Sequence, residues 1–235
     1  MAPITNLSEE TTWLACGENC MPIDVLRRHG KNAPSTPYST GRSDAEHLEY
    51  FETSTYQNFL EESYLIKSNA FTNECYINVS KRSSGKLKPG RHQYLEFTHH
   101  NPLEPKDNKI LRRRIERMIE IRSKDTPHCF FYHHRSQRGF ETTRELIKEK
   151  MMSVINNYKQ ATTALCYSQK IVANKSQRGV EVIQCADGRI LFFTLKTLLP
   201  WAGNNLDIFF GKTDDDLFKR VFQIQEKLFK NALGY

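Results

Sequence analysis

Residues 11–30 of this 235-residue chain, TTWLACGENCMPIDVLRRHG, predict a strand, a tight turn and a helix in direct succession. The β-rich run TTWLAC ends at Gly17, and glycine tolerates the backbone angles that a tight turn needs. The helical pattern that follows carries Pro22 in its first turn, where no N–H is required, and closes at Gly30. This succession places Cys20 at the N-terminal end of the helix.

Short apolar runs alternate with helical patterns along the rest of the chain. Further strands are expected at residues 64–67, 75–80, 94–98, 129–134, 163–168, 180–185 and 189–195, and further helices at 43–52, 106–122, 142–158 and 214–231. The turn sequence Ala186-Asp187-Gly188 predicts a hairpin, so the sheet is expected to be mixed. The alternation predicts an α/β fold: a single domain over residues 1–235, with a mixed central β-sheet flanked by helices.

Two of the expected helices carry local signals for their ends or faces. Ser43 and Glu46 have the spacing of a capping box at the start of the helix at 43–52. In the helix at 106–122, one apolar stripe is formed by Ile110, Leu111, Ile115, Met118 and Ile119. The arginines of this helix are expected on its remaining surface.

The chain is basic, because 34 Lys and Arg residues exceed 27 Asp and Glu residues and leave a net charge of +7. Much of the surplus lies at residues 81–91 and at Arg112, Arg113, Arg114 and Arg117. Neither segment interleaves its charges with aromatic residues, so nucleic-acid binding is not expected. No apolar run approaches the ~20 residues of a membrane helix, and residues 1–10 have no secretory signal. We therefore expect a cytoplasmic protein without a membrane partner.

The six cysteines are expected to be reduced thiols, because no secretory signal accompanies them. Those at positions 16, 75, 129, 166 and 185 are expected to pack as small hydrophobic side chains. The spacing of Cys16 and Cys20 and the two His-His doublets lack the pattern of a zinc site. The sequence therefore predicts no metal and no cofactor.

Cys20 differs from the other cysteines, because a helix N-terminus lowers the pKa of a thiol through its positive potential and unpaired N–H groups. The same N–H groups suit an oxyanion, with the side chain of Asn19 as an extra donor. A thiol nucleophile needs a base, and the best placed is His99 or His100, at the end of the strand at 94–98. The alternative is that Cys20 only caps the helix or fills space.

Other residues compete for the supporting roles. His100 adjoins His99, and the doublet His133-His134 repeats the arrangement at the end of the strand at 129–134. A third group should orient the imidazole, and the candidates near predicted turns are Asp187, Asn204 and Asp207. Asp207 completes the predicted catalytic set of Cys20, His99 and Asn19.

Four segments form a pattern that extends over the first half of the chain. They are LACGENCMPIDVLRRHG at 14–30, TPYSTGRSDAEHLEYFE at 36–52, FTHH at 97–100 and RRRIERM at 112–118. Together they resemble an uncharacterised bacterial family described as papain-like cysteine peptidases. The resemblance implies that Cys20 is the nucleophile and His99 the base of a hydrolase. It also implies that the basic helix carries Arg113, Arg114 and Arg117.

Two functions are compatible with these residues. In the first, Cys20 attacks the carbonyl carbon of a peptide or amide while His99 carries the proton. In the second, the turn at residues 17–20 binds a phosphate or carboxylate group and the thiol does no chemistry. The expected partner is a peptide or a small anionic substrate. The residues expected to bind this ligand are Gly17, Ser39, Arg42, His100, Arg113 and Arg114.

Overall fold

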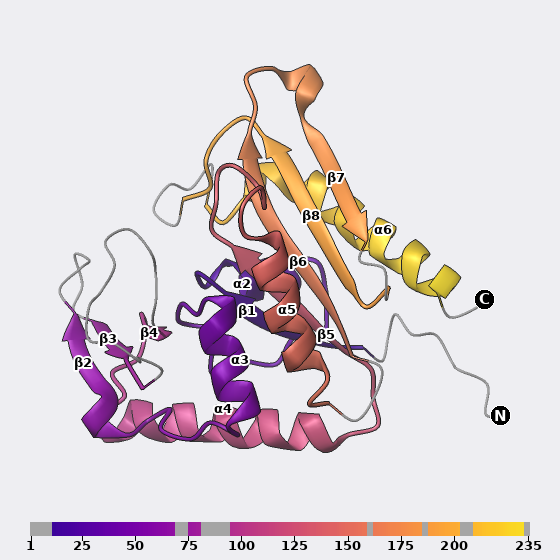
Figure 1. The fold of residues 1–235 in the computed structure, drawn as a ribbon. Helices are drawn as coiled ribbons and strands as arrows, with labels where there is room; N and C mark the ends of the chain where they lie inside the picture. Colours follow the sequence, from indigo (N-terminus) through magenta and orange to yellow (C-terminus); the bar gives the residue numbers. More distant parts are fainter. Residues whose placement is uncertain are drawn as a thin grey trace.

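The computed structural model describes residues 11–68, 75–80, 95–158, 162–184, 188–202 and 209–232, and Figure 1 shows its fold. The strands are β1 (Thr12–Gly17), β2 (Leu65–Ser68), β3 (Cys75–Asn78), β4 (Leu95–Phe97), β5 (His128–His134), β6 (Thr162–Ile171), β7 (Gly179–Gln184) and β8 (Ile190–Thr197). The α-helices are α2 (Met21–Arg28), α3 (Ala45–Thr53), α4 (Pro105–Ser123), α5 (Arg144–Ile155) and α6 (Asp215–Ala232). The described strands form a five-stranded sheet in the order β1-β5-β6-β8-β7 and a three-stranded sheet in the order β2-β3-β4.

The larger sheet is mixed, as the sequence predicts. Strands β1, β5, β6 and β8 run parallel, and β7 pairs with β8 in the antiparallel sense. Residues 186 and 187 of the expected hairpin turn lie outside the described residues. In the register of β1 and β5, Gly17 lies opposite His133. Because parallel strands end at the same edge of a sheet, the turn after Gly17 lies beside the end of β5.

The smaller sheet is joined to this edge by the loop before α3. Arg42 in the loop exchanges two backbone hydrogen bonds with Glu96 of β4, at 2.9 and 2.8 Å. Gly41 allows this approach, because a Cβ there would lie 2.2 Å from the carbonyl oxygen of Glu96. Ser43, two residues after Gly41, donates its N–H to the carbonyl oxygen of Gly17 at 2.8 Å. The loop therefore brings the end of β4 close to the end of β1.

Helices cover both faces of the larger sheet (Figure 1). On one face α3, α4 and α5 pack against side chains such as Phe130 and Tyr132 of β5. On the other face α2 and α6 pack against the alternate side chains, which include Phe131. Since successive side chains of a strand point to opposite faces, burial on both faces requires an unbroken apolar run such as CFFY in β5. The predicted α/β domain with a mixed central sheet flanked by helices is confirmed.

The predicted capping box of α3, Ser43 with Glu46, is wrong. Asp44, not Ser43, is the N-cap, and its Oδ1 accepts the N–H of His47 at 2.8 Å. Ser43 is fully buried and belongs to the loop that is bonded to Gly17. A tertiary hydrogen bond of Ser43 thus moves the start of the helix by one residue.

The predicted apolar stripe of α4 is also wrong at one position. Ile119 is 42% exposed, whereas Ile121 is buried together with Leu111 and Met118. Leu111, Met118 and Ile121 follow one another at spacings of seven and three positions. The buried face of α4 is therefore narrower than the predicted stripe and does not include Ile119. Among the described residues, no helix is long and apolar enough to cross a membrane.

Candidate functional site

The turn between β1 and α2 depends on a glycine. Gly17 has a φ of +129°, which side chains disfavour, and a Cβ there would lie 2.5 Å from both the backbone N and O of His133. The turn then continues alongside β5, because Glu18 donates its N–H to the carbonyl oxygen of His133 at 2.9 Å. Cys20 follows as the N-cap of α2, as predicted, and its side chain makes no capping hydrogen bond.

The side chain of Glu18 anchors the turn to the end of β5. Its Oε1 accepts a hydrogen bond from the hydroxyl of Tyr132 at 3.1 Å and lies 2.8 Å from Nδ1 of His134. Its Oε2 accepts the backbone N–H of Arg135 at 2.9 Å. The other ring nitrogen of His134 lies 3.0 Å from the hydroxyl of Thr143. Both nitrogens of His134 are therefore engaged in structural contacts.

His133 contacts the turn through Asn19 and is neutral at neutral pH. Its ring is buried, stacked on Tyr167 at a centroid distance of 4.8 Å, and lies 5.7 Å from the ring of Trp201. Burial lowers the pKa of His133 to about 3. Its Nδ1 lies 2.8 Å from Oδ1 of Asn19, which also accepts the N–H of Met21 at 3.2 Å.

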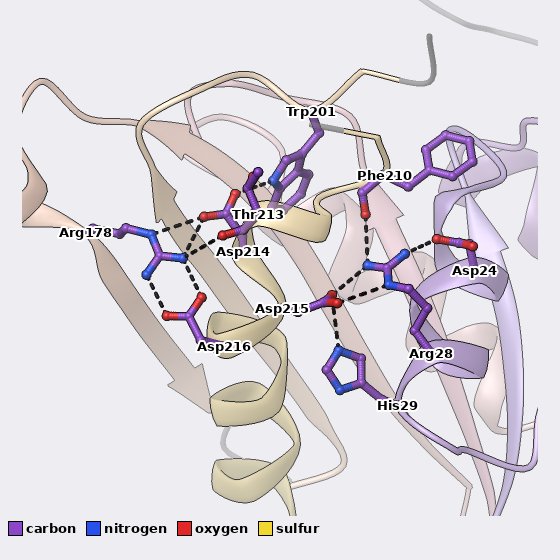
Figure 2. Close-up of polar contacts among 10 residues, drawn as sticks. All are labelled: Asp24, Arg28, His29, Arg178, Trp201, Phe210, Thr213, Asp214, Asp215 and Asp216. Carbon is purple, nitrogen blue, oxygen red and sulfur yellow. Dashed lines mark hydrogen bonds and ion pairs between the residues drawn. The ribbon is translucent and has the colours of Figure 1, made fainter. Parts of the chain in front are cut away.

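Polar contacts at the start of α6 hold Trp201 in this position (Figure 2). The indole N–H of Trp201 donates to Asp214 Oδ2 at 2.9 Å, while Arg178 donates to Asp214 Oδ1 at 2.8 Å. In the same region Arg28, in the last turn of α2, pairs with Asp215 at 2.7 Å. Asp214, Asp215 and Asp216 lie at the N-terminal end of α6, where the positive potential of the helix favours acidic side chains.

The thiol of Cys20 is half-buried, whereas Cys16, Cys75, Cys129 and Cys166 are buried. Burial raises the pKa of the Cys20 thiol above its usual 9.0, and the charge of Glu96 adds to this effect. A hydrogen bond from its own backbone N–H and the charge of Arg42 act in the opposite direction. The free protein therefore holds Cys20 as the neutral thiol at neutral pH.

An ion pair that the local sequence patterns do not predict acts on both candidate catalytic residues. Nη1 of Arg42 lies 3.5 Å from Oε2 of Glu96, whose side chain is only 1% exposed. The other carboxylate oxygen of Glu96 accepts the hydroxyl of Thr98 at 2.8 Å. The charges of Arg42 and Glu96 affect the pKa values of both Cys20 and His99. A buried acid in the apolar run YLEFT was the signal that could have revealed this pair.

His99 and Cys20 share these neighbours, but in the described part of the chain no hydrogen bond joins the thiol to an imidazole. Burial, followed by the neighbouring charge of His100, lowers the pKa of His99 below 6.5. The ring of His99 is thus neutral at neutral pH and able to accept a proton. His100 is turned toward α4, where its Nδ1 lies 3.4 Å from Asp107 Oδ1.

Two of the other predicted ligand residues, Ser39 and Arg114, form hydrogen bonds with the loop before α3. Ser39 is buried, and its hydroxyl accepts the backbone N–H of Thr36 at 2.7 Å. Arg114 donates to the hydroxyl of Thr40 at 2.6 Å, and Arg113 is exposed on α4. Asp207 lies outside the described residues, as do Asp187 and Asn204. The structure thus brings Gly17, Asn19, Cys20, Arg42 and His99 together and directs Ser39 and Arg114 elsewhere.

A surface groove of about 310 Å³ lies between α4 and the segment that follows α3. Its lining includes Phe59, Leu60 and Arg112, and it contains neither Cys20 nor His99. The thiol and this groove are therefore separate features of the surface.

Among the described residues, no group of three or more His, Cys, Asp or Glu side chains could hold a metal ion. Comparison with protein-family models, with curated proteins and with solved structures finds no match to this chain. The candidate site is therefore defined by the geometry at the ends of β1, β4 and β5.

Proposed function

We propose that the chain is a cysteine-dependent hydrolase or acyl-transfer enzyme in which Cys20 is the nucleophile and His99 the base. The observation that carries the proposal is the position of Cys20. It is the half-buried thiol among the described cysteines, at the N-terminus of α2, beside the Arg42–Glu96 pair that it shares with His99. The resemblance of residues 14–30 and 97–100 to papain-like cysteine peptidases supports the same assignment.

Catalysis begins from the neutral thiol, because burial raises the pKa of Cys20. The neutral imidazole of His99 accepts the thiol proton as Sγ attacks the carbonyl carbon of a peptide or amide, and a C–S bond forms. The imidazolium then returns this proton to the leaving amine, and water hydrolyses the thioester. Substrate binding must bring the thiol and the imidazole into hydrogen-bond contact, as it does in other enzymes whose free forms have loose catalytic contacts.

Asn19 is oriented to assist in the tetrahedral intermediate. Its Oδ1 is occupied by the N–H of Met21 and by Nδ1 of His133. The NH₂ group of Asn19 is therefore left to donate to the oxyanion, together with the backbone N–H of Cys20. His133 acts here as a positioning residue.

Acylation by p-nitrophenyl acetate, followed by mass spectrometry of the intact chain and its peptides, tests the assignment. We expect acetyl transfer to Cys20 and none in Cys20→Ser. His99→Gln should slow the transfer at neutral pH by about 100-fold or more, the usual contribution of a general base. His29→Gln is the matched control, because that ring lies at the other end of α2 beside Asp215, and it should change the rate less than about twofold. Equal rates in the two histidine variants would contradict the assignment of His99.

An anionic ligand at the same turn is the second candidate function. Two guanidinium groups lie near each other there: burial, and then the charge of Arg42, lower the pKa of Arg135. The alternative predicts that inorganic phosphate raises the melting temperature of both the wild type and Cys20→Ser, and that Arg42→Gln removes the effect. If the turn has no phosphate site, the effect of phosphate on the melting temperature should be the same in Arg42→Gln as in the wild type.

A further inference from the structure

Arginines from two helices converge on the loop between α2 and α3. Arg27, near the end of α2, donates to the hydroxyl of Ser35 at 3.0 Å. Arg117 of α4 donates to the carbonyl oxygen of the same residue at 2.9 Å. Arg114, one turn earlier in α4, donates to the hydroxyl of Thr40 at 2.6 Å. These three residues and the adjoining Arg113 form what we term the arginine cluster.

Among the described residues, the arginine cluster differs from several other arginines of the chain in forming no ion pair with a carboxylate. Arg28, Arg122 and Arg178 each pair with a carboxylate, at 2.7, 2.8 and 2.8 Å. Within the part of the chain that the structure describes, no carboxylate forms an ion pair with any member of the cluster; their hydrogen bonds go to hydroxyl and carbonyl oxygens. Asp107 acts on Arg114 through its charge without an ion pair, so the described residues offset the positive charge of the cluster only in part.

Keeping these charges together lowers the stability of the free protein. Arg113 and Arg117 are four residues apart on α4, a spacing at which like charges repel. Burial, and then the charges of the other cluster members, lower the pKa of Arg114. Three hydrogen bonds nevertheless hold these arginines in place. A bound anion would offset the repulsion between their charges, so the cluster is suited to bind one.

We propose that the arginine cluster binds the phosphate groups of a small molecule that carries a diphosphate or triphosphate. A guanidinium group presents paired N–H donors that match phosphate oxygens. A carboxylate carries one negative charge, whereas two linked phosphates carry about three or four and match the four arginines. The cluster is confined to the end of α2 and one part of α4, on either side of the loop that holds Ser35 and Thr40, which favours a compact polyanion over a long strand. The proposal concerns a second site and does not depend on the chemistry of Cys20.

Titration calorimetry of the full chain with sodium pyrophosphate tests this site. We expect binding that weakens roughly tenfold or more in Arg117→Gln, since a charge-assisted hydrogen bond is lost. Arg112→Gln is the matched control: it is exposed on the same helix, bonded to Asn108, and changes the net charge by the same amount. It should retain wild-type affinity within about twofold. Arg114→Lys retains the charge but not the paired donors. Its affinity for pyrophosphate should lie between those of Arg117→Gln and Arg112→Gln.

Three results would overturn the proposal. The first is that pyrophosphate does not bind, or binds equally to the Arg117 and Arg112 variants when both are folded by circular dichroism. The second is that Arg42→Gln alone abolishes binding, which would assign the anion to the turn beside Cys20. The third is that oligothymidylate displaces pyrophosphate and binds more tightly as it is lengthened, which would indicate a nucleic-acid surface.

Discussion

Oδ1 of Asn19 lies 2.8 Å from Nδ1 of His133 and also accepts the backbone N–H of Met21. Because a backbone N–H can only donate, the amide atom at this point must be the oxygen. The imidazole must then donate through Nδ1, which defines the neutral tautomer of His133 with an unprotonated Nε2. One hydrogen bond thus sets both the tautomer of a buried histidine and the direction of the Asn19 NH₂ group beside Cys20.

The neutral state of His133 predicts a pH dependence of stability. Its pKa is about 3 in the folded protein and about 6.5 when exposed, so between these values the unfolded state binds the additional proton. Stability contributed by this group is present above about pH 6.5 and decreases as pH falls, by up to about 1.4 kcal/mol per unit. In His133→Phe the difference in unfolding free energy between neutral and mildly acidic urea titrations should be smaller than in the wild type. An unchanged difference would mean that His133 is not held neutral.

Gly17→Ala should be among the most destabilising single substitutions in the chain. The variant would place a Cβ 2.5 Å from backbone atoms of His133 at a φ of +129°, so we expect a loss of about 3 kcal/mol or more. Gly179→Ala is the control, because no atom lies within 4 Å of the position that its Cβ would occupy, and it should change stability by less than about 0.5 kcal/mol. Urea denaturation of both variants measures the difference.

The buried carboxylate of Glu52 should make Arg122 essential for stability. Glu52 is fully buried, accepts hydroxyls of Tyr38 and Tyr158 at 3.1 and 2.9 Å, and pairs with Arg122 at 2.8 Å. Arg122→Leu leaves the carboxylate without its counter-charge and should cost about 3 kcal/mol in unfolding free energy. The double variant Glu52→Gln/Arg122→Leu should recover part of this loss. A double variant that is less stable by the sum of the two single losses would show that the charges are not coupled.

The reactivity of Cys20 should depend on Arg42. Because burial raises the pKa of the thiol, alkylation of Cys20 by iodoacetamide should be slow at neutral pH and accelerate above the usual thiol range. Arg42 favours the thiolate, so Arg42→Gln should move the midpoint of the rate profile upward. Arg138→Gln, an exposed arginine after β5, should leave the midpoint unchanged. Peptide mapping assigns the label to Cys20, and a downward movement in Arg42→Gln would contradict the charge assignment.

Local sequence patterns were sufficient for most of the secondary structure. The β1–turn–α2 succession, the antiparallel β7–β8 pair and the helix at residues 106–122 were predicted because each depends on neighbouring residues. Ser43 and Ile119 were misplaced because contacts with distant residues decided their positions. The hydrogen bond from Arg114 to Thr40 could not be predicted from local patterns either, because the two residues are 74 positions apart in the sequence.

The sequence by itself determined that Cys20 stands at the start of a helix directly after a glycine turn, because the signals for strand, turn and helix all lie within 20 residues. Only the tertiary structure decided what surrounds the thiol. The parallel pairing of β1 with β5 brings His133 into contact with Asn19. The backbone pairing of Arg42 with Glu96 brings β4 and His99 to the same edge of the larger sheet. The physical reason is that these partners are separated by about 50 to 110 residues, so their meeting depends on the order of strands in two sheets and not on any local preference.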